Sequence, residues 1–481
     1  MKNFKRYIAF TLLFTIIFSN FIEVYAATST KTYEEKISKE IISVKDDEFV
    51  DVIVKLKKEI DSEKIKTEVK KSNPNINKDQ LQKQIRKEIV DESVSLAENS
   101  QKSILKFLDK NKKEGSVKSY KSFFIVNCVN IVAKKSIVIE LAKRPDVEEI
   151  IENKKIKIER PEKNFPEARE ASLSYSSKHV PWNLKAIGAD KAQELTKDSS
   201  NEVVVAIIDS GVDSSHPAIS KNYRGNDSNL SASSWYNTID GKNGAEEKPF
   251  DDRGHGTHVC GTILGSKEGS LLGVAPKTKW IAVKVFDKNG DTDNTKLLAA
   301  GEWILAPTDA KGNKHPELAP RIVNNSWGGN SSDGFYQDMV KKWREAGIFP
   351  VFSAGNVSET NNGGDNSIGT PGSYPEAYAV GAIRKDEKVA KFSLRGKSDY
   401  TNKWKPDIVA PGVNILSSVP GNRYELYTGT SMASPHVSGV VALMLQANKD
   451  LSVEQIEKIL NNNVVQAMDN DVEYIVMGKR D

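Results

Sequence analysis

Three short motifs, far apart along the chain, contain the residue types of a nucleophile and its proton relay. Asp209 follows the continuous apolar run 203–208, His255 stands between two glycines, and Ser431 lies among small residues. A serine hydroxyl becomes an effective nucleophile only when a neighbouring base takes its proton, and that base needs a buried acid that fixes its tautomer. Asp209, His255 and Ser431 could fill these three roles.

Each of these residues is expected at the end of a regular element. The run 203–208 is typical of a strand buried on both faces of a parallel sheet, and chemistry in open α/β sheets gathers beyond the carboxyl ends of the strands. The glycines beside His255 let other groups approach its imidazole closely, at what has the pattern of a loop entering a helix. Ser431 opens an apolar helix, and helix N-termini favour developing negative charge.

Simpler interpretations exist for each motif alone. A lone aspartate after a strand is more often a turn residue, and a lone serine at a helix start is more often a cap. His255 and His258 are three residues apart, whereas zinc peptidases need two histidines four apart with a glutamate after the first. We therefore expect no metal at this motif, and the three motifs together favour nucleophilic catalysis.

The order Asp, His, Ser with these local motifs resembles the subtilisin family of serine peptidases, especially its bacillopeptidase F-type branch. The similarity runs from about Trp182 to about Asn463. The resemblance implies an α/β fold, with a mostly parallel central sheet flanked by helices. It also implies peptide-bond hydrolysis through an acyl-enzyme, with Asp209, His255 and Ser431 as the catalytic residues.

The resemblance assigns the groups that bind substrate as well. Asn356 matches the side-chain donor to the tetrahedral oxyanion, with the backbone N–H of Ser431 as the second donor. The expected substrate-binding residues form the pairing strand, the oxyanion segment and the pocket floor: Ser326, Trp327, Gly328, Gly329, Ser353, Ala354, Gly355 and Gly369. A glycine floor at 369 and Val357 at the rim predict a preference for large apolar or aromatic residues on the acyl side of the cut bond.

Departures from the family pattern concern metal and thiols. Family members with the tight calcium site carry an acid where this chain has Ala218, and the companion loop 266–270 lacks the expected asparagine. Hard cations need several oxygen ligands with negative charge among them. We expect no cofactor for the chemistry and no calcium at the usual tight site, and we leave another structural calcium site open. Cys128 and Cys260 are expected to be buried, unpaired thiols.

Residues 1–26 have the pattern of an export signal. A positively charged start precedes the apolar run 7–18, and small residues follow at 24–26. The alternative is a membrane anchor, but Asn20 and Glu23 end the apolar run well short of the ~20 residues that a spanning helix needs. We expect the signal to be removed and the mature protein to be secreted, outside any membrane.

Residues 27–175 differ in composition from the rest. Of 31 glycines only Gly115 lies before Gly188, and all seven tryptophans lie at or after Trp182. The pattern predicts a small α+β domain. Its expected elements are an alternating strand at 50–56, a long charged helical stretch, a strand over 120–133, a helix at 137–141 and returning strands over 147–158.

By the resemblance, 27–175 is an inhibitory propeptide that assists folding, and 176–481 is the catalytic domain. The C-terminal tail of the propeptide is expected to lie in the substrate cleft like a product. Self-cleavage between Tyr175 and Ser176 would then free the enzyme. The final segment, 464–481, lacks the glycine-rich ending of the relatives, which puts the stability of the last helix in question.

Composition limits the partners. The net charge of +4 is small and dispersed, so nucleic acid is not an expected partner. We expect protein or peptide substrates, the chain's own propeptide as an intramolecular inhibitor, and a monomer. The rival hypothesis is a non-catalytic relative that keeps the fold as a binding module, but such relatives lose a triad residue or the oxyanion donor. Broad scavenging and dedicated processing of one precursor both fit the sequence.

Overall fold

The computed structural model describes residues 32–158, 180–267, 270–328, 334–469 and 472–476. The predicted signal 1–26, the predicted cleavage site Tyr175-Ser176 and Gly329 lie outside the described residues. By its contacts the chain divides into two compact units. The first comprises Met1–Lys57, Ile104–Tyr120 and Ile131–Glu152, and the second comprises Lys58–Ser103, Lys121–Asn130 and Asn153–Asp481.

A four-stranded sheet, in the order β2-β3-β1-β4, forms the core of the first unit. Its strands are β1 (Phe49–Leu56), β2 (Val117–Phe123), β3 (Cys128–Lys134) and β4 (Val147–Glu152), accompanied by helices α2 (Lys39–Ile42) and α5 (Lys135–Ala142). β1 and β4 are antiparallel, with Val52 opposite Glu152. Val52, Ile53 and Val54 are all fully buried, so β1 is covered on both faces, where its alternating pattern predicted one.

The predicted single strand over 120–133 is wrong: the structure has two strands there, because β2 ends at Phe123 and β3 begins at Cys128. The backbone N–H groups of Phe124 and Ile125 donate to the carboxylate of Glu302 instead of to a neighbouring strand. Ile125 is fully buried at this turn. A run of apolar residues therefore had the composition of a strand, while a distant carboxylate stabilises a turn within it.

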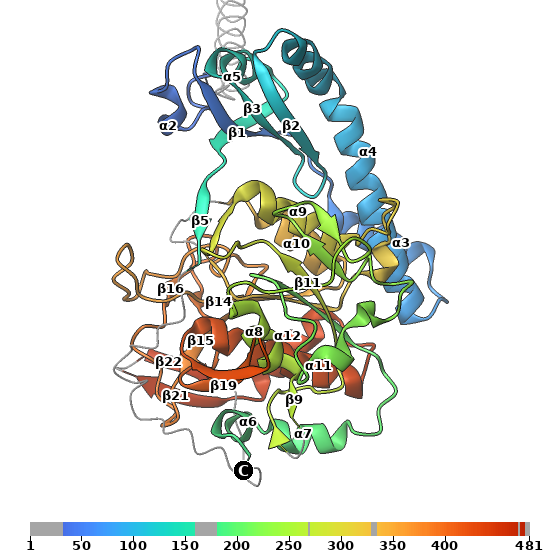
Figure 1. Ribbon diagram of the computed structural model, residues 1–481, viewed down its shortest axis with the longest axis vertical. Helices are drawn as coiled ribbons and strands as arrows, with labels where there is room; N and C mark the ends of the chain where they lie inside the picture. The colour runs from blue at the N-terminus through green and yellow to red at the C-terminus, as the bar shows by residue number, and fades with distance from the viewer. Residues whose placement is uncertain (1–31, 159–179, 268–269, 329–333, 470–471, 477–481) are drawn as a thin grey trace, which may run out of the picture. The chain divides into compact units, whose positions relative to one another are not determined.

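A ten-stranded sheet forms the core of the second unit, in the order β21-β22-β18-β15-β14-β13-β6-β11-β7-β8. The pairs from β7 through to β22 are parallel, whereas β7-β8 and β21-β22 are antiparallel. This confirms the predicted α/β class with a mostly parallel sheet (Figure 1). The strands are β6 (Val204–Asp209), β7 (Trp235–Asn237), β8 (Lys242–Asn243), β11 (Lys279–Lys284), β13 (Ile322–Asn325), β14 (Phe349–Ser353), β15 (Tyr378–Ile383), β18 (Ile408–Pro411), β21 (Val465–Asp469) and β22 (Val472–Val476).

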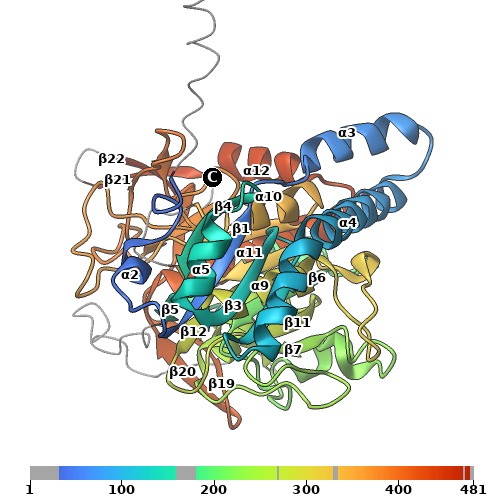
Figure 2. The ribbon, with the colours of Figure 1, turned by 90° about the horizontal axis from the view of Figure 1, so that it is seen from above.

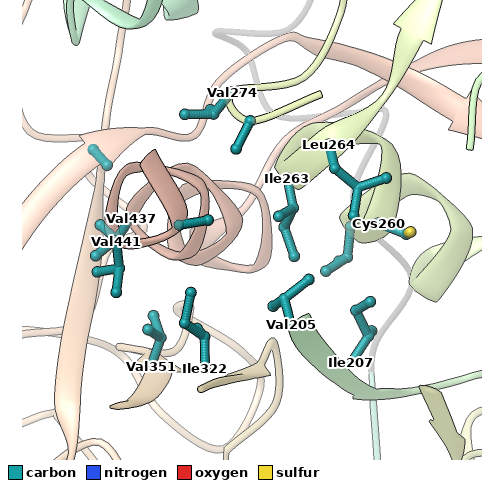
Figure 3. Packing of buried hydrophobic residues seen from close by; sticks show 14 of the residues in the cluster. Val205, Ile207, Cys260, Ile263, Leu264, Val274, Ile322, Val351, Val437 and Val441 are labelled. Carbon is teal, nitrogen blue, oxygen red and sulfur yellow. The ribbon is translucent and has the colours of Figure 1, made fainter. Parts of the chain in front are cut away.

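Helices pack on this sheet through apolar side chains. They are α6 (Trp182–Ala186), α7 (Ala189–Leu195), α8 (His255–Leu264), α9 (Asn294–Leu305), α10 (Gln337–Glu345), α11 (Thr430–Ala447) and α12 (Val453–Asn462). Val437 and Val441 of α11 lie over Ile322 and Val351 of the sheet, and Ile263 of α8 lies over Val205 (Figure 3). Burial of these side chains fixes α8 and α11, whose first turns contain His255 and Ser431, against the strands.

The remaining helices, strands and hairpins lie outside these two sheets or connect them in sequence. The long charged stretch forms α3 (Ser62–Ser72) and α4 (Lys78–Lys113), of which α4 begins in this unit. Of the predicted returning strands, β4 joins the four-stranded sheet, whereas β5 (Lys155–Lys157) pairs antiparallel with β12 (Asp291–Asp293). Small hairpins are β9-β10 (Ser266–Lys267, Ser270–Leu271), β16-β17 (Gly396–Lys397, Trp404–Lys405) and β19-β20 (Ile415–Val419, Arg423–Tyr427).

The last helix, which the sequence left in question, is present and capped. The Ser452 hydroxyl accepts from the backbone of Gln455, and the Gln455 side chain accepts in return from the backbone of Ser452. Cys128 and Cys260 are both buried, as predicted, and no disulfide joins them. Among the described residues, no helix is both long and apolar enough to cross a membrane.

Candidate active site

Asp209 and His255 form a buried pair. Asp209 ends β6, and its two carboxylate oxygens lie 2.7 and 2.9 Å from Nδ1 of His255. The two side chains are 1% and 2% exposed. Because Nδ1 donates to the carboxylate, the neutral imidazole keeps its lone pair on Nε2, where a proton can be accepted. The structure brings these two predicted residues together.

A close approach between α8 and the end of β6 makes this pair possible. α8 begins at His255, after Gly254 in the left-handed region at φ 96°. A Cβ atom at Gly256 would lie 2.1 Å from the carbonyl oxygen of Gly211 and 3.0 Å from Cβ of Asp209. Any side chain at position 256 would therefore push the helix away from Asp209. Glycines at 254 and 256 thus allow the start of α8 to approach the residues that follow β6, in keeping with the close approach that the sequence predicted.

Asp251 connects the segment that follows Asp209 to the segment that contains His255. It accepts hydrogen bonds from the Ser210 hydroxyl (2.9 Å), from the backbone N–H groups of Arg253, Gly254 and Thr257 (3.0, 2.8 and 2.9 Å), and from the Thr257 hydroxyl (2.7 Å). The Ser210 hydroxyl in turn accepts from the backbone of Gly256, at 3.0 Å. Burial raises the pKa of Asp251, and its donors partly offset that effect.

Lys284 fastens the other side of the Asp209 turn. Its buried Nζ donates to the carbonyl oxygens of Ser210 (2.7 Å) and Phe286 (2.8 Å), and to the carboxylate of Asp252 (2.6 Å). The residue that follows Asp209 is thus bonded through its hydroxyl by Asp251 and through its carbonyl by Lys284. These hydrogen bonds limit how far Asp209 can move from His255.

Ser431 is the second residue of α11, at the helix N-terminus where it was expected. Its hydroxyl donates to the carbonyl oxygen of Ser326 at 3.0 Å, and the Ser326 hydroxyl donates back to the Ser431 carbonyl at 3.0 Å. Within the described residues, no hydrogen bond joins Ser431 to His255, although their helices α8 and α11 pack against each other. The acid–base pair is therefore formed, while the serine hydroxyl is turned toward Ser326. Long or unmade catalytic hydrogen bonds are common in unliganded sites.

Asn356 is held beside the backbone of Ser431. Its side-chain oxygen accepts from the backbone N–H of Thr430 (2.9 Å) and from the Thr430 hydroxyl (3.1 Å). A Cβ atom at Gly429 would lie 3.6 Å from Nδ2 of Asn356 and 3.7 Å from the backbone nitrogen of Ser431. Two N–H donors from segments far apart in the sequence thus lie close to one point, which is the arrangement predicted for an oxyanion site.

The predicted substrate-binding segments also lie next to one another. Ser326, Trp327 and Gly328 follow β13, and Ser353 ends β14, followed by Ala354 and Gly355. A Cβ atom at Gly328 would lie 3.6 Å from the carbonyl oxygen of Thr370, and one at Gly372 would lie 3.3 Å from that of Ser353 and 3.4 Å from that of Gly369. The three segments therefore border a common region. Gly329 is outside the described residues.

Comparison with known proteins places this arrangement in a family. A family model described as the subtilase family matches residues 200–476. The chain is 42% identical over 446 residues to bacillopeptidase F from Bacillus subtilis (strain 168), which covers 90% of this chain and 31% of that relative. It is also 34% identical over 285 residues to a subtilisin from Bacillus pumilus, covering 59% of this chain and 90% of the relative. The chain belongs to the subtilase family.

The extent of these matches differs between the relatives of this subtilase. The match to bacillopeptidase F includes the front part of the chain, whereas the matches to subtilisins, such as subtilisin amylosacchariticus at 34% identity, cover 59% of the chain. The chain spans about 31% of the length of bacillopeptidase F and 65% of that of subtilisin amylosacchariticus.

The sequence did not assign a role to the groups that fix the acid–base pair of the subtilase. Asp251 precedes His255 by four residues, but its partner Ser210 is 41 residues away. Lys284 ends a strand whose four middle residues, 280–283, are apolar, and a lysine in such a position is a signal of a buried cation that needs partners. The identity of those partners depends on the fold.

Proposed function

We propose that this chain contains the catalytic domain of a serine endopeptidase that hydrolyses peptide bonds through an acyl-enzyme. One observation supports this most: Asp209 at the end of β6 and His255 at the start of α8 form a buried pair, while two N–H donors converge beside Ser431 on α11, which packs against α8. A binding module would have no need of a buried acid that orients an imidazole. Three side chains and two N–H groups suffice for this chemistry, so we propose no cofactor for it.

In the proposed mechanism, rotation about the Cα–Cβ bond turns the Ser431 hydroxyl from the Ser326 carbonyl toward Nε2 of His255. The oxygen attacks the substrate carbonyl carbon, and its proton passes to Nε2. Asn356 and the Ser431 backbone donate to the oxyanion that forms. The imidazolium, stabilised by Asp209, then gives the proton to the leaving amine, and water attacks the acyl-enzyme by the reverse route.

A serine-directed phosphonyl probe tests this proposal. We expect covalent labelling of the wild-type chain at Ser431 and none in Ser431→Ala. Ser438→Ala is the matched control, because Ser438 lies on the same helix and donates to Asn324 at 2.8 Å. Labelling of the control with none in Ser431→Ala supports the nucleophile. A properly folded wild-type chain that neither reacts nor cleaves peptides would favour the non-catalytic alternative.

We further propose that the chain is exported and matures by cutting itself between Tyr175 and Ser176, separating a propeptide (27–175) from the catalytic domain (176–481). Support comes from Ile158, the last described residue before the proposed cut. The Ile158 carbonyl accepts from Arg253 at 2.7 Å, two residues before His255, and the Ile158 N–H donates to Gly290 at 2.9 Å. The chain is thus bonded beside the start of α8 where it enters the region of the proposed cut.

N-terminal sequencing of the secreted protein tests the maturation. A start at Ser176 is expected, and a start before Phe165 or after Trp182 would contradict the proposed site. Ser431→Ala should remain at full precursor mass, and spontaneous maturation of that variant would argue against self-processing.

We also propose a preference for large apolar or aromatic residues on the acyl side of the cut bond. Val357, at the predicted rim, offers no charge to attract lysine or arginine. Cleavage of a peptide library would check this, and a preference for basic residues there would contradict it. The same experiment separates broad scavenging from dedicated processing by the range of sequences cut.

A further inference from the structure

Three backbone carbonyls converge at the amino ends of two central strands. Ala319 and Pro320 lie just before β13, and Ala346 lies just before β14. All three accept hydrogen bonds from one guanidinium, that of Arg86 on α4. The distances are 2.7 Å from Nε to Ala346, 3.0 Å from Nη1 to Ala319 and 3.4 Å from Nη2 to Pro320. Arg86 is 3% exposed, so the contact is a buried one.

This arrangement selects a guanidinium in particular. Its planar fork carries five N–H donors, and here each of its three nitrogens meets a different carbonyl oxygen. A lysine ammonium would present its three donors from one nitrogen instead of from three separate ones. Burial, with a contribution from neighbouring Arg321, lowers the pKa of Arg86 to about 9, so it stays charged at neutral pH.

Other contacts of the same segment surround the Arg86 site. Lys66 of α3 lies 2.8 Å from Glu345, at the end of α10, and 2.8 Å from Glu454 on α12. Figure 2 shows α3 beside these two helices. The Gln82 side chain covers Gly347, where a Cβ atom would lie 2.4 Å from it. We call Lys58–Ser103, which belongs to the second unit, the helical arm.

The helical arm contacts the sheet at the amino ends of β13 and β14, whereas the candidate active site lies at their carboxyl ends. Ser326 follows β13 and Ala354 follows β14, whereas the three carbonyls precede the same two parallel strands. At about 3.3 Å per residue, strands of this length separate the two edges by roughly 13–16 Å. A group in the Arg86 site therefore does not touch a substrate held at the carboxyl ends.

We propose that the carbonyls of Ala319, Pro320 and Ala346 form a guanidinium-binding site for the chain's own Arg86. When the chain is cut within 159–179, the residues before the cut form a front fragment that includes the helical arm. The bound Arg86 then holds this front fragment on the residues that follow the cut. The inference rests on the proposed maturation only for the cut. Breaking the covalent link alone then does not release the front fragment. Release also requires the arm to leave an anchor that is separate from the substrate-binding edge.

The test uses the full chain carrying Ser431→Ala and a recognition sequence for a foreign site-specific protease within 159–179. The cut is made by the added protease, so the result does not depend on the chain's own activity. Dissociation of the two fragments is followed by gel filtration at decreasing concentration. The unaltered arm should keep the fragments together. Lys87→Ala is the matched control, since Lys87 is the next residue on α4 and is exposed, paired with Asp91.

Arg86→Ala should raise the dissociation constant about tenfold to a hundredfold, because it leaves buried carbonyls without donors. Arg86→Lys should weaken retention as well, and millimolar guanidinium, but not ammonium, should restore retention in Arg86→Ala. The proposal is overturned if Arg86→Ala retains the fragment as well as Lys87→Ala does, or if Arg86→Lys matches the unaltered arm. The fragments separating at once with the arm intact would also overturn it, while leaving the proposed catalysis untouched.

Discussion

The polar groups at the two ends of strands β13 and β14 differ in how fully they are hydrogen-bonded. At the amino ends, arginines saturate the carbonyls: Arg86 binds three, and Arg321 binds those of Gly347, Lys449 and Leu451 at 3.3, 2.8 and 2.8 Å. At the carboxyl ends, the Ser431 hydroxyl donates to a single acceptor, and Nδ2 of Asn356 and the backbone nitrogen of Ser431 lie close to one point beside Gly429. The difference separates anchoring from chemistry on one pair of strands.

The charges at the two ends differ in how they respond to pH. The helices at the carboxyl ends contain the buried histidines His258 and His436, whereas the amino ends are held by arginines that remain protonated. His258 stacks on Tyr427, and its Nε2 donates to the carbonyl of Ile415 at 2.9 Å. We therefore expect acid to loosen the carboxyl end first, and four predictions test the contrast between the ends.

Acid should produce the largest effect. Burial lowers the pKa of His258 to about 3 and that of His436 to about 4, whereas an unfolded histidine titrates near 6.5. The free energy of unfolding is therefore full above pH 6.5 and falls as the pH drops toward these values. Between about pH 7 and about pH 4.5 we expect a loss on the order of 4 kcal/mol, measured by urea unfolding of Ser431→Ala. His258→Gln should show a flatter pH dependence, and an equally steep one would contradict the assignment.

Asn356→Ala should lower kcat about 10²–10³-fold, which is the loss known for the corresponding donor in subtilisin. KM should change little, because the donor bonds the oxyanion and not the ground-state carbonyl. Steady-state kinetics on a peptide substrate measure both constants. A rise in KM with unchanged kcat would place Asn356 in ground-state binding instead.

Asp251→Asn should lower kcat/KM about tenfold to a hundredfold through a looser Asp209–His255 pair. Asparagine keeps the shape but offers an N–H where the carboxylate accepts from Ser210 or Thr257. The readout that separates positioning from simple destabilisation is the pH profile of kcat/KM, whose acidic limb should shift because the Asp209 carboxylate would contact the imidazole differently. A variant that is less stable but has an unshifted profile would reduce Asp251 to a structural role.

Arg321→Met should have the smallest effect on catalysis and a modest one on stability. It leaves the carbonyls of Lys449 and Leu451 without their donor, so the free energy of unfolding should fall by about 1–2 kcal/mol. The kcat/KM value should stay within a factor of about two, because the change lies at the amino ends of the strands. A large loss of kcat/KM in a stable variant would show that the two ends are coupled.

The fold class was predicted from the resemblance to subtilisins, whereas the position of each site motif on a strand or helix was predicted from local patterns. The apolar run 203–208 gave a buried strand, and the glycines around His255 gave a close approach. The same local reasoning failed at 120–133, where a turn is stabilised by Glu302, a residue distant in sequence. Apolar composition cannot reveal a turn whose acceptor comes from another element.

The positioning groups were beyond the sequence for a related reason. Side chains of the types of Ser210, Asp251 and Lys284 are common in turns or on surfaces. Their positioning role depends on hydrogen bonds between them: Ser210 donates to Asp251 and accepts from Lys284 through its carbonyl oxygen. Arg86 is the extreme case, because an arginine in a highly charged helix is expected to face solvent, yet it is buried under loops more than 230 residues away. Long-range hydrogen bonds are fixed only when the fold brings the acceptors together.

The absence of a side chain at Gly256 has a consequence for the redesign of this protein. The turn after Asp209 and the first residues of the helix that follows Gly254 are in van der Waals contact, so neither can be exchanged without the other. Transfer of the acid and the base to another scaffold would therefore require both segments together, with glycine kept at position 256.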